Sequence, residues 1–429
     1  MTTPRTAPDI RDESHARALD AADPLRAFRE RFHIPTLGHA RPVAYMTGNS
    51  LGLQPRTTRA IVEQELKDWA ELAVEAHFQA AHPWYAYHEM FRDPGDRLAG
   101  AKPGACEVVM MNSLTVNLHL LMASFYRPTR ERFRIVIERG AFPSDEHAVA
   151  SQARFHGHDP KDAVLRLTPR KGERTLRTED IEATLEREGH TIALLLLGGV
   201  NYATGQRFDI PRITRAAHAQ GVVAGYDLAH AAGNVPLRLH EWNADFAAWC
   251  SYKYLNAGPG SLAGCFIHER HHNAALPRLE GWWGTNTTTR FLMRPDFDPG
   301  RGAEAWQISN PPVLAAAPLK ASLDIFDEAG ADALRTKSLA LTGYLRALLE
   351  QIEGLDVVTP RDDDAHGCQL SIRLTDPGAD GRALQKALLA RGVVADYREP
   401  DTLRLAPVPL YNTYHDAQRA ADALRLLTA

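Results

Sequence analysis

The chain has 429 residues, a length that accommodates one large domain and a smaller companion, each with its own core. Its 49 lysines and arginines against 53 acidic residues give a formal charge of -4, and no basic run occurs, which argues against nucleic acid or an anionic membrane as a partner. The four cysteines lack CxxC spacing, and no segment has the length and apolarity of a membrane span. Since no apolar stretch at the N-terminus resembles a secretory signal, we expect a cytoplasmic protein.

The N-terminal part of the chain, residues 1–45, is predicted to be a polar segment with one short helix that packs on the smaller domain. It leads into "AYMTGNSLGLQP", residues 44–55, where turn-forming residues predict a loop. We therefore place the start of the first folded domain at residue 46.

A large α/β domain is predicted over residues 46–315. From about residue 105, short apolar runs alternate with polar or glycine-containing turns and helical patterns; the runs are "CEVVMMN", "RFRIVIE", "TIALLLLGGV", "GVVAGYDLA", "ADFAAWCSY" and "LAGCFIHE". Unbroken apolar runs are typical of strands that helices cover on both faces. The domain should therefore contain a mostly parallel sheet.

A smaller α+β domain is predicted over residues 316–429, after the proline-rich "SNPPVLAAAPL". A long amphipathic helix, about residues 331–352, precedes two alternating strands, "LDVVTP" and "CQLSIRL". A helix near 381–391, two further strands, "VVADYRE" and "TLRLAPV", and a last helix from His415 complete the unit. Two domains with a cleft between them are the expected architecture.

Lys253 stands apart from the other basic residues. Only 8 of the 49 are lysines, and Lys253 is the one lysine between Lys171 and Lys320. The chain uses arginine where positive charge suffices, whereas lysine can lose its proton and act as an amine nucleophile. A solvated surface lysine is the ordinary interpretation, so the case for a catalytic lysine depends on its neighbours.

Asp227 and His230 directly follow a predicted buried strand, where a carboxylate must be paired or functional. Asp227 precedes Lys253 by 26 residues, which is room for one helix, one strand and their turns, so both should lie at adjoining strand ends. In an α/β sheet, ligands gather at that edge. An acid for the pyridine nitrogen and a lysine for the aldehyde end are what pyridoxal phosphate requires, and Ser113 or Thr115 can cap a helix that accepts its phosphate.

Several stretches of the chain, from about residue 45 to 420, resemble the kynureninase family, pyridoxal-phosphate enzymes of the aspartate aminotransferase superfamily (fold type I). These stretches are "NSLTVNLHLLMASF", "FPSDEHA", "YDLAHAAGN", "CSYKYLNAGPGS", "GWWG", "RFLM", "SNPP" and "LRLAPVPLYNTYHD". Several are specific to that family rather than to the superfamily. The resemblance implies pyridoxal 5'-phosphate as the cofactor and a homodimer with active sites at the subunit interface.

The resemblance also implies roles for individual residues. Lys253 would be the Schiff-base lysine, and Tyr252 an acid–base group that also contacts the phosphate. Asp227 would pair with the ring nitrogen, with His230 beside it, and Phe142 would stack on the ring. Further cofactor contacts are implied for Leu114, Thr115, Ser144, Asp145, Trp282 and Asn310, and substrate contacts for Arg404, Asn310 and His77.

Two further expectations concern the substrate carboxylate and the cofactor phosphate. Arg404 would hold the substrate α-carboxylate through a bidentate pair. Where some relatives carry a serine near the cofactor, this chain has Gly198, so one contact to the phosphate or an aspartate is expected to be missing or taken by water.

The reaction implied by the resemblance is hydrolysis of L-kynurenine, or of its 3-hydroxy form, to an anthranilate and L-alanine in tryptophan degradation. Lys253 would remove the α-proton, the ring paired with Asp227 would take up the electrons, and Tyr252 would return a proton to the alanine fragment. The sequence leaves open the preference between the two substrates, which depends on a few atoms near His77, Ser309 and Asn310. It also leaves open whether the enzyme serves catabolism or NAD synthesis.

Other interpretations compete with this one. A class V aminotransferase or a cysteine desulfurase would share the fold, and the desulfurase would need a reactive Cys368; the strand-like "QLSIRL" that follows favours a structural cysteine. A non-enzymatic binding protein would be free to lose Lys253, Asp227 or Arg404, and all three are present. In "HERHH", residues 268–272, no cysteine or acid has closed-site spacing, so we expect no metal and a solvated patch.

Overall fold

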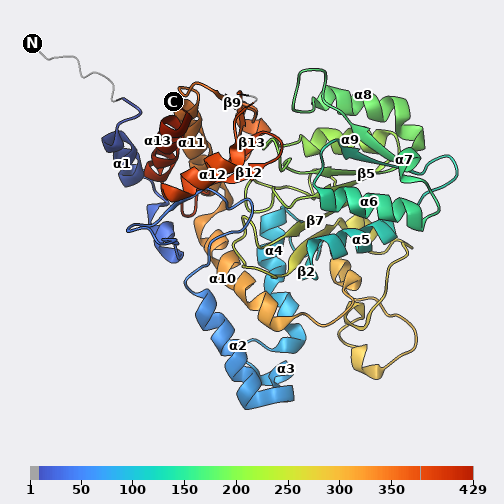
Figure 1. The fold of residues 1–429 in the computed structure, drawn as a ribbon. Coiled ribbons are helices and arrows are strands. Elements are labelled where there is room, and N and C mark those ends of the chain that lie inside the picture. The colour runs from blue at the N-terminus through green and yellow to red at the C-terminus, as the bar shows by residue number, and fades with distance from the viewer. Residues whose placement is uncertain (1–8, 377, 429) are drawn as a thin grey trace, which may run out of the picture.

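A seven-stranded sheet forms the centre of the computed structural model, which describes residues 9–376 and 378–428 (Figure 1). Neighbouring strands pair in parallel except β8, which is antiparallel to both β2 and β7. In spatial order the strands are β2 (Val108–Met111), β8 (Ala263–Ile267), β7 (Phe246–Cys250), β6 (Val223–Asp227), β5 (Ile192–Gly198), β3 (Arg134–Glu138) and β4 (Val164–Leu167). The prediction of a mostly parallel sheet is confirmed.

Each face of this sheet has its own apolar core. Along β5, Leu195 and Leu197 join one core while Leu196 joins the other, as expected for a strand that is covered on both faces. The first core also contains residues of α8 (Thr178–Glu188), α9 (Ile210–Ala219) and α10 (Val313–Ala329). The second contains residues of α5 (Leu114–Phe125) and α6 (Pro143–Phe155).

Close packing within the sheet depends on a glycine. A Cβ atom on Gly264 would lie 2.2 Å from Cε2 of Trp249, whose side chain is fully buried on the neighbouring strand β7. Only glycine lets the indole lie flat against β8 at this point.

A second, antiparallel sheet forms the smaller part of the molecule. Its strand order is β12 (Asp396–Arg398), β13 (Thr402–Leu405), β10 (Leu370–Leu374) and β9 (Leu355–Val357). The helices α11 (Ala331–Leu349), α12 (Gly381–Ala390) and α13 (Tyr414–Thr428) belong to this part (Figure 1).

The N-terminal segment lies against this smaller part. Asp20 of α1 (Glu13–Ala22) accepts a hydrogen bond from the backbone N–H of Tyr414, at the start of α13, at 2.6 Å. The short strand β1 (Ala44–Tyr45) pairs in parallel with β11 (Val393–Val394). The domain boundaries at residues 45 and 315 themselves stay predictions.

The remaining helices frame the lower end of the molecule in Figure 1, where α2 (Thr58–Leu72) and α3 (Ala76–Gln79) project beside α10 and α4 (Arg92–Ala99). No helix in the described ranges has the length and apolarity to cross a membrane. The other short helical segments are α7 (Pro160–Ala163), η1 (Arg26–Arg31), η2 (Ala73–Glu75), η3 (Trp84–Phe91), η4 (Gly189–Thr191), η5 (Glu269–His271), η6 (Trp282–Gly284), η7 (Arg290–Leu292), η8 (Gly302–Trp306) and η9 (Asp363–Ala365).

Candidate active site

A cavity lies where the carboxyl ends of β2, β3, β5, β6 and β7 meet. This is the edge at which parallel sheets bind ligands. Nine of the predicted site residues line it, namely Leu114, Thr115, Phe142, Ser144, Asp145, Asp227, His230, Tyr252 and Lys253.

The Lys253 amine is surrounded by rings. Its Nζ atom lies 3.2 Å from Nε2 of His230, 5.7 Å from the ring centroid of Phe142 and 5.9 Å from that of Tyr252. Burial, together with the nearby charge of Lys253, holds the pKa of His230 well below its usual range. The lysine therefore has a neutral imidazole as its hydrogen-bond partner rather than a second cation.

Three carboxyl groups face the same cavity. Asp227, at the end of β6, accepts a hydrogen bond from the backbone N–H of Ala229 at 2.7 Å. Burial and the neighbouring carboxylates raise the pKa of Asp145, whose protonated form hydrogen-bonds Asp227. Glu138, at the end of β3, is the third, and burial raises its pKa to about 7. The cavity therefore suits a ligand with a cationic group near Asp227.

The start of α5 also lines the cavity. Ser113 is the N-cap residue, and its side chain makes no capping hydrogen bond to the helix. The first backbone N–H groups of a helix lack intrahelical partners and attract anions. Beside them, the hydroxyls of Thr115 and Ser144 lie 2.8 Å apart. A phosphate fits these donors.

Two further properties of the cavity side chains fit bound pyridoxal phosphate. Phe142 is 42% exposed and lines the cavity, where a bound ligand would cover its ring. Nδ1 of His230 is buried and has no hydrogen-bond partner. An anion-binding helix start, an acid for a ring nitrogen, an aromatic face and a lysine amine therefore occur around one space.

Arg404 lies just behind the cavity wall. Its side chain is almost fully buried, and Nη1 donates to the backbone oxygen of Tyr202, a wall residue, at 2.7 Å. Nη2 donates to the Asp396 carboxylate, while Nε has no partner. Burial lowers the Arg404 pKa to about 10, which leaves the guanidinium charged at neutral pH.

The single chain does not bring the remaining predicted residues to the cavity. Trp282 is 43% exposed and Asn310 is exposed on the surface. Nδ1 of His77 on α3 lies 2.9 Å from the backbone oxygen of Val74, and the imidazole contacts the Trp84 ring edge-on. The roles of these three residues stay predictions.

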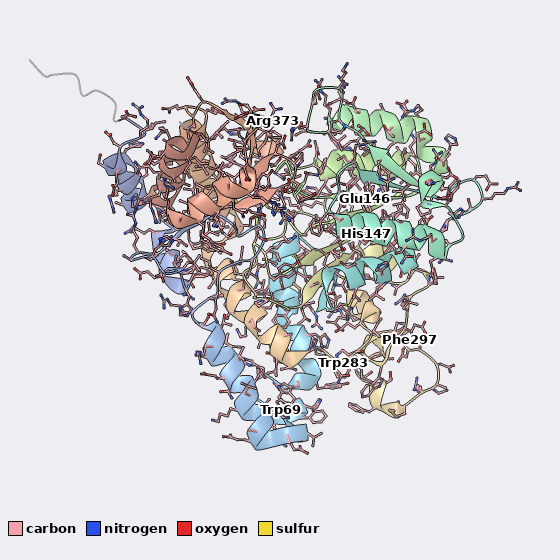
Figure 2. All side chains as sticks on the ribbon, in the orientation of Figure 1. Trp69, Glu146, His147, Trp283, Phe297 and Arg373 are labelled. Atoms are coloured by element: carbon pink, nitrogen blue, oxygen red, sulfur yellow. The ribbon has the colours of Figure 1, made fainter. Side chains whose placement is uncertain are left out.

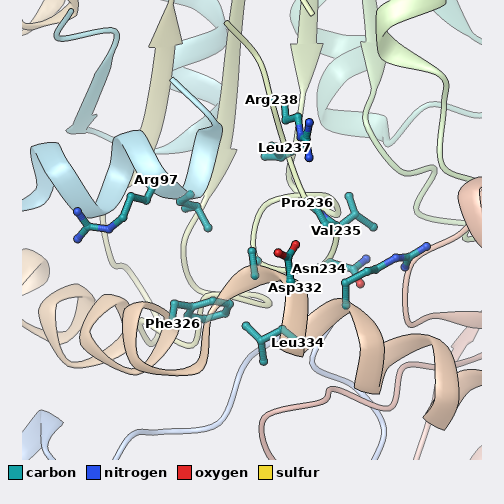
Figure 3. A pocket seen from close by; sticks show the side chains of 13 residues that line it. Arg97, Asn234, Val235, Pro236, Leu237, Arg238, Phe326, Asp332 and Leu334 are labelled. Atoms are coloured by element: carbon teal, nitrogen blue, oxygen red, sulfur yellow. The ribbon is translucent and has the colours of Figure 1, made fainter. Parts of the chain in front are cut away.

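A second cavity, shown in Figure 3, lies between α4, the loop 233–238 and the junction of α10 with α11. It contains none of the predicted site residues. Its wall residue Asn234 donates to the backbone oxygen of His230 at 2.8 Å and accepts from the backbone N–H of Cys368 at 2.9 Å. The cavity is therefore adjacent to the segment that carries His230.

The histidines of residues 268–272 are not solvated as expected. His268 is buried, and its imidazole stacks on that of His240 with 4.8 Å between ring centroids. Ligand atoms of these two residues and Glu107 lie within 4.8 Å of one another. Both Glu107 oxygens, however, already accept backbone N–H groups, those of Lys102 and Glu269, at 2.8 Å. The Glu107 carboxylate therefore holds the loops that contain Lys102 and Glu269 together. The expectation of a solvated patch was wrong, because it did not consider partners distant in the sequence such as Glu107 and His240.

Sequence reasoning missed Glu138 and Tyr202 as cavity residues. Glu138 ends the run "RFRIVIE", so the rule that singled out Asp227, a carboxylate at the end of a buried strand, would have found it. Tyr202 carried no such signal, since its position depends on contacts with Phe142 and Arg404.

The chain is similar to curated proteins over nearly its whole length. Kynureninase from Myxococcus xanthus is 55% identical over 427 residues, 99% of each chain. Kynureninase from Salinispora tropica is 58% identical over 421 residues, 97% of each chain. The family model of the kynureninase C-terminal domain matches residues 334–424.

Solved structures share the fold at low identity. The cysteine desulfurase CsdA from Escherichia coli superposes with a TM-score of 0.75 at 20% identity, covering 93% of this chain and 97% of that one. A C-DES variant with glycine covalently linked to its PLP cofactor gives 0.75 at 16% identity, covering 92% and 99%.

The chain has the fold class of the aspartate aminotransferase type, with a lysine at the carboxyl edge of its main sheet. Within that class, the identity over nearly the full length decides the family. The chain belongs to the kynureninase family.

Proposed function

We propose that the protein hydrolyses L-kynurenine, or 3-hydroxy-L-kynurenine, to the corresponding anthranilate and L-alanine, with pyridoxal 5'-phosphate as its cofactor. One observation carries this proposal: a chain that matches kynureninases over nearly its whole length has its isolated lysine, Lys253, in the cavity at the strand ends. Such a reaction is a step of tryptophan degradation.

The cofactor, when bound, supplies a cationic ring that takes up the electrons released as the substrate loses its α-proton. We assign its phosphate to the start of α5, with Leu114, Thr115 and Ser144, and its aldehyde carbon to Lys253. Asp227 would hold the ring nitrogen and Phe142 would cover one ring face. The support for these roles is that all six residues line one cavity.

Lys253 is the base in this proposal, because it is the one lysine among the residues that line the cavity. A lysine freed from the cofactor acts as a base only if it is not held as a permanent ion pair. Its hydrogen-bond partner His230 is neutral, and the three cavity carboxyls share at least one proton. This environment lets the amine accept the α-proton and pass it on.

Tyr252 is the proposed proton donor to the alanine fragment. Burial and the neighbouring Cys250 raise the pKa of its phenol above the usual value, so the group keeps its proton at neutral pH. Its ring centroid lies 5.9 Å from Nζ of Lys253, and both side chains line the cavity, so donor and base face one space.

Arg404 is the proposed ligand of the substrate α-carboxylate. It is a buried, charged guanidinium next to the wall residue Tyr202, and its Nε atom lacks a partner. A carboxylate that enters here gains a charge-assisted pair.

A second copy of the chain would complete the site. The rings of His77, Phe78, Tyr85, Phe291 and Trp282 follow one another at centroid distances of 5.5–6.4 Å; we call them the aromatic surface. Phe78 and Phe291 are 60% and 56% exposed, and exposed apolar patches of this kind mark interaction sites. Figure 2 shows Trp69 and Trp283 at this same end of the molecule.

This surface supports a homodimer in which His77 and Trp282 of one subunit face the cavity of the other. The two residues were assigned to the site but lie away from the chain's own cavity, and both belong to the aromatic surface. A partner that buries this surface would satisfy both observations.

Cysteine desulfurase chemistry is disfavoured by Cys368. The thiol is fully buried, and burial raises its pKa to about 12, whereas a nucleophilic cysteine needs exposure and a lowered pKa. The four cysteines are all unpaired, which suits the cytoplasm in which we place the enzyme.

The test is the fluorescence of anthranilate formed when the cofactor-loaded protein is mixed with L-kynurenine or its 3-hydroxy form. We expect turnover by the parent and a loss of about 10³-fold or more in Lys253→Ala. Lys320→Ala is the matched control, because Lys320 lies on α10, pairs with Asp324 and does not line the cavity. A loaded parent that converts neither substrate would exclude the proposed reaction, and full activity of Lys253→Ala would exclude the proposed base.

A further inference from the structure

Glu138 is a buried acid in the cofactor cavity that the proposed roles do not use. It is the last residue of β3, only 5% exposed, and lines the cavity together with Asp145, Asp227 and Lys253. A carboxyl group in such a position needs either a partner or a proton.

The charge of Glu138 has little hydrogen-bond support. Within the described residues it forms no salt bridge, and its hydrogen bond from a neighbouring strand is that of the Gly198 backbone N–H, a long contact of 3.4 Å to Oε2. The Asn201 amide also lies close enough to lower the pKa, but burial outweighs both. The hydrogen bond from Gly198 is longer than the one that Oδ1 of Asp227 accepts from the Ala229 N–H at 2.7 Å, and burial raises the pKa of both carboxyls.

The charged groups that face Glu138 make its ionisation worse. Asp145 approaches from α6 and Asp227 from β6, while Lys253, after β7, is the single lysine of the cavity. Three buried carboxyls around one amine exceed what the amine can balance. A bound pyridine nitrogen requires only one carboxylate, so at least one further group must stay protonated.

Gly198 gives Glu138 its place. A Cβ atom on Gly198 would lie 3.0 Å from Oε1 of Glu138, tighter than most contacts of that kind. Because Gly198 has no side chain, the Glu138 carboxyl can lie directly against the end of β5. At this end Gly198 is paired with Asp227 of β6.

We propose that Glu138 is a positioning residue: as an uncharged acid it leaves the negative charge of the cavity on the Asp145–Asp227 pair, and as an anion it strengthens proton binding by the cofactor linked to Lys253. The proposal rests on the proposed function only in its choice of cofactor. Since Glu138 passes between these two states near neutral pH, it makes the cofactor environment pH-sensitive.

The sign of the effect follows from the charges. In the parent, rising pH ionises Glu138, and its negative charge then favours the protonated form of the nitrogen that links the cofactor to Lys253. Glutamine at this position keeps the size and stays neutral at every pH. The midpoint of the cofactor's absorbance change with pH should therefore lie lower in Glu138→Gln, by about half a pH unit to one unit.

The experiment is a spectroscopic pH titration, from about pH 5 to pH 9, of the cofactor-loaded protein without substrate. Glu146→Gln is the control, because Glu146, labelled on α6 in Figure 2, pairs with Arg166 at 2.6 Å and does not line the cavity. We expect a shifted midpoint in Glu138→Gln and the parental midpoint in Glu146→Gln. A parental midpoint in Glu138→Gln, or equal shifts in both variants, would overturn the proposal.

A conservative variant covers the case in which Glu138→Gln does not load the cofactor. Glu138→Asp retains an acid, so loading with a pH-dependent midpoint close to the parental one supports the proposal, and failure of both variants to load would show a purely structural role. Because the titration uses no kynurenine, it is independent of the anthranilate assay. A protein that titrates as expected but makes no anthranilate would separate this inference from the proposed reaction.

Discussion

Burial decides which titratable residues near the cavity hold protons at neutral pH. It keeps His230 neutral and Tyr252 protonated, and it raises the pKa of Asp145 and Glu138. Lys253 therefore lies among groups that carry less charge than their formal types suggest.

Cys368 offers a test at this scale that separates the family from its structural neighbours. Cys368→Ala should retain the kcat/KM of the parent for kynurenine, because the thiol is fully buried and protonated. Removal of the sulfur should reduce the free energy of unfolding by about 1 kcal/mol, since a small buried group is lost. Steady-state kinetics and urea unfolding measure the two quantities.

The outcome is diagnostic because a desulfurase would depend on this thiol. A large loss of activity in a Cys368→Ala protein that unfolds at the parental urea concentration would contradict the structural role of the cysteine. Cys265→Ala, another fully buried cysteine on β8, shows how much loss of a thiol alone changes stability.

The sequence was enough to predict those site residues whose type and position in the chain are unusual. It was not enough for properties that depend on how distant segments pack. Lys253 and Asp227 could be selected because a lone lysine and an acid after a buried strand are unusual. The raised pKa of Glu138 could not be predicted, because it comes mainly from burial and in part from Asp227, which lies on another strand. For Trp282 and His77 the sequence implied a cofactor or substrate contact, but it could not reveal that both lie on an exposed surface of the single chain.

Among the elements, one carboxylate ties three together. Asp245, 4% exposed and just before β7, accepts the backbone N–H of Ala224 on β6 at 2.7 Å. The imidazole of His218 on α9 approaches it at 2.8 Å, and His271 and Arg270 of η5 bind its other oxygen at 2.7 and 2.6 Å. Asp245 therefore fixes the sheet to a helix and to a loop.

Asp245→Asn should destabilise the protein by about 2–4 kcal/mol at neutral pH, because a buried anion that faces Arg270 and two histidines is lost. Burial alone would raise the pKa of Asp245, but these hydrogen bonds outweigh it and lower the pKa below 3.8. A lowered pKa means stability that is present above the unfolded value and lost as the pH falls below it. The difference between parent and variant should therefore shrink below about pH 4, as measured by thermal unfolding.

Asp327→Asn is the matched control at the same charge change. Its partner Arg97 is 58% exposed in its side chain, so this surface pair should contribute less than about 1 kcal/mol. Equal destabilisation by both substitutions, or a difference at neutral pH that persists unchanged in acid, would contradict the role given to Asp245.

The strands were predictable to the extent that their apolar runs were unbroken. All six predicted runs of the main sheet contain strands, and the helices of residues 331–349 and 381–390 lie where the pattern indicated. The strand β4, "VLRL", was missed because it is short and interrupted by Arg166. The run "VVADYRE" divides between β11 and β12 in two different sheets, a distinction that depends on which partners lie nearby rather than on the run itself.

The segment "SNPPVLAAAPL" was interpreted as a domain boundary, yet most of it belongs to the 17-residue helix α10. Pro318 lies in the second turn of that helix, where it removes only the hydrogen bond to Leu314, a residue that is 42% exposed. Most of the segment is therefore helical, and a domain boundary at residue 315 stays a prediction.

At the scale of the whole molecule, the proposed dimer depends on the aromatic surface. Phe291→Glu should weaken self-association by about 30-fold or more, because it places a charge among stacked rings that the partner would bury. Sedimentation measurements at several concentrations give the dissociation constant. Activity should fall in parallel with dissociation if His77 and Trp282 serve the partner's cavity.

Phe155→Glu is the control for this measurement, since Phe155 is 85% exposed at the end of α6 and lies outside the aromatic surface. A parent that sediments as a monomer, or a dimer that tolerates Phe291→Glu as well as Phe155→Glu, would show that the interface lies elsewhere.

The cavity also has a consequence for how the chain reaches its native state. Its walls come from the ends of five strands spread from Ser113 to Lys253, and the order of those strands in the sheet does not follow their order in the sequence. Contacts between such distant segments form late, because closing long loops precedes any gain from them. No early intermediate can therefore hold the cofactor, and the recovery of its absorbance during refolding would report completion of the central sheet rather than the appearance of helices.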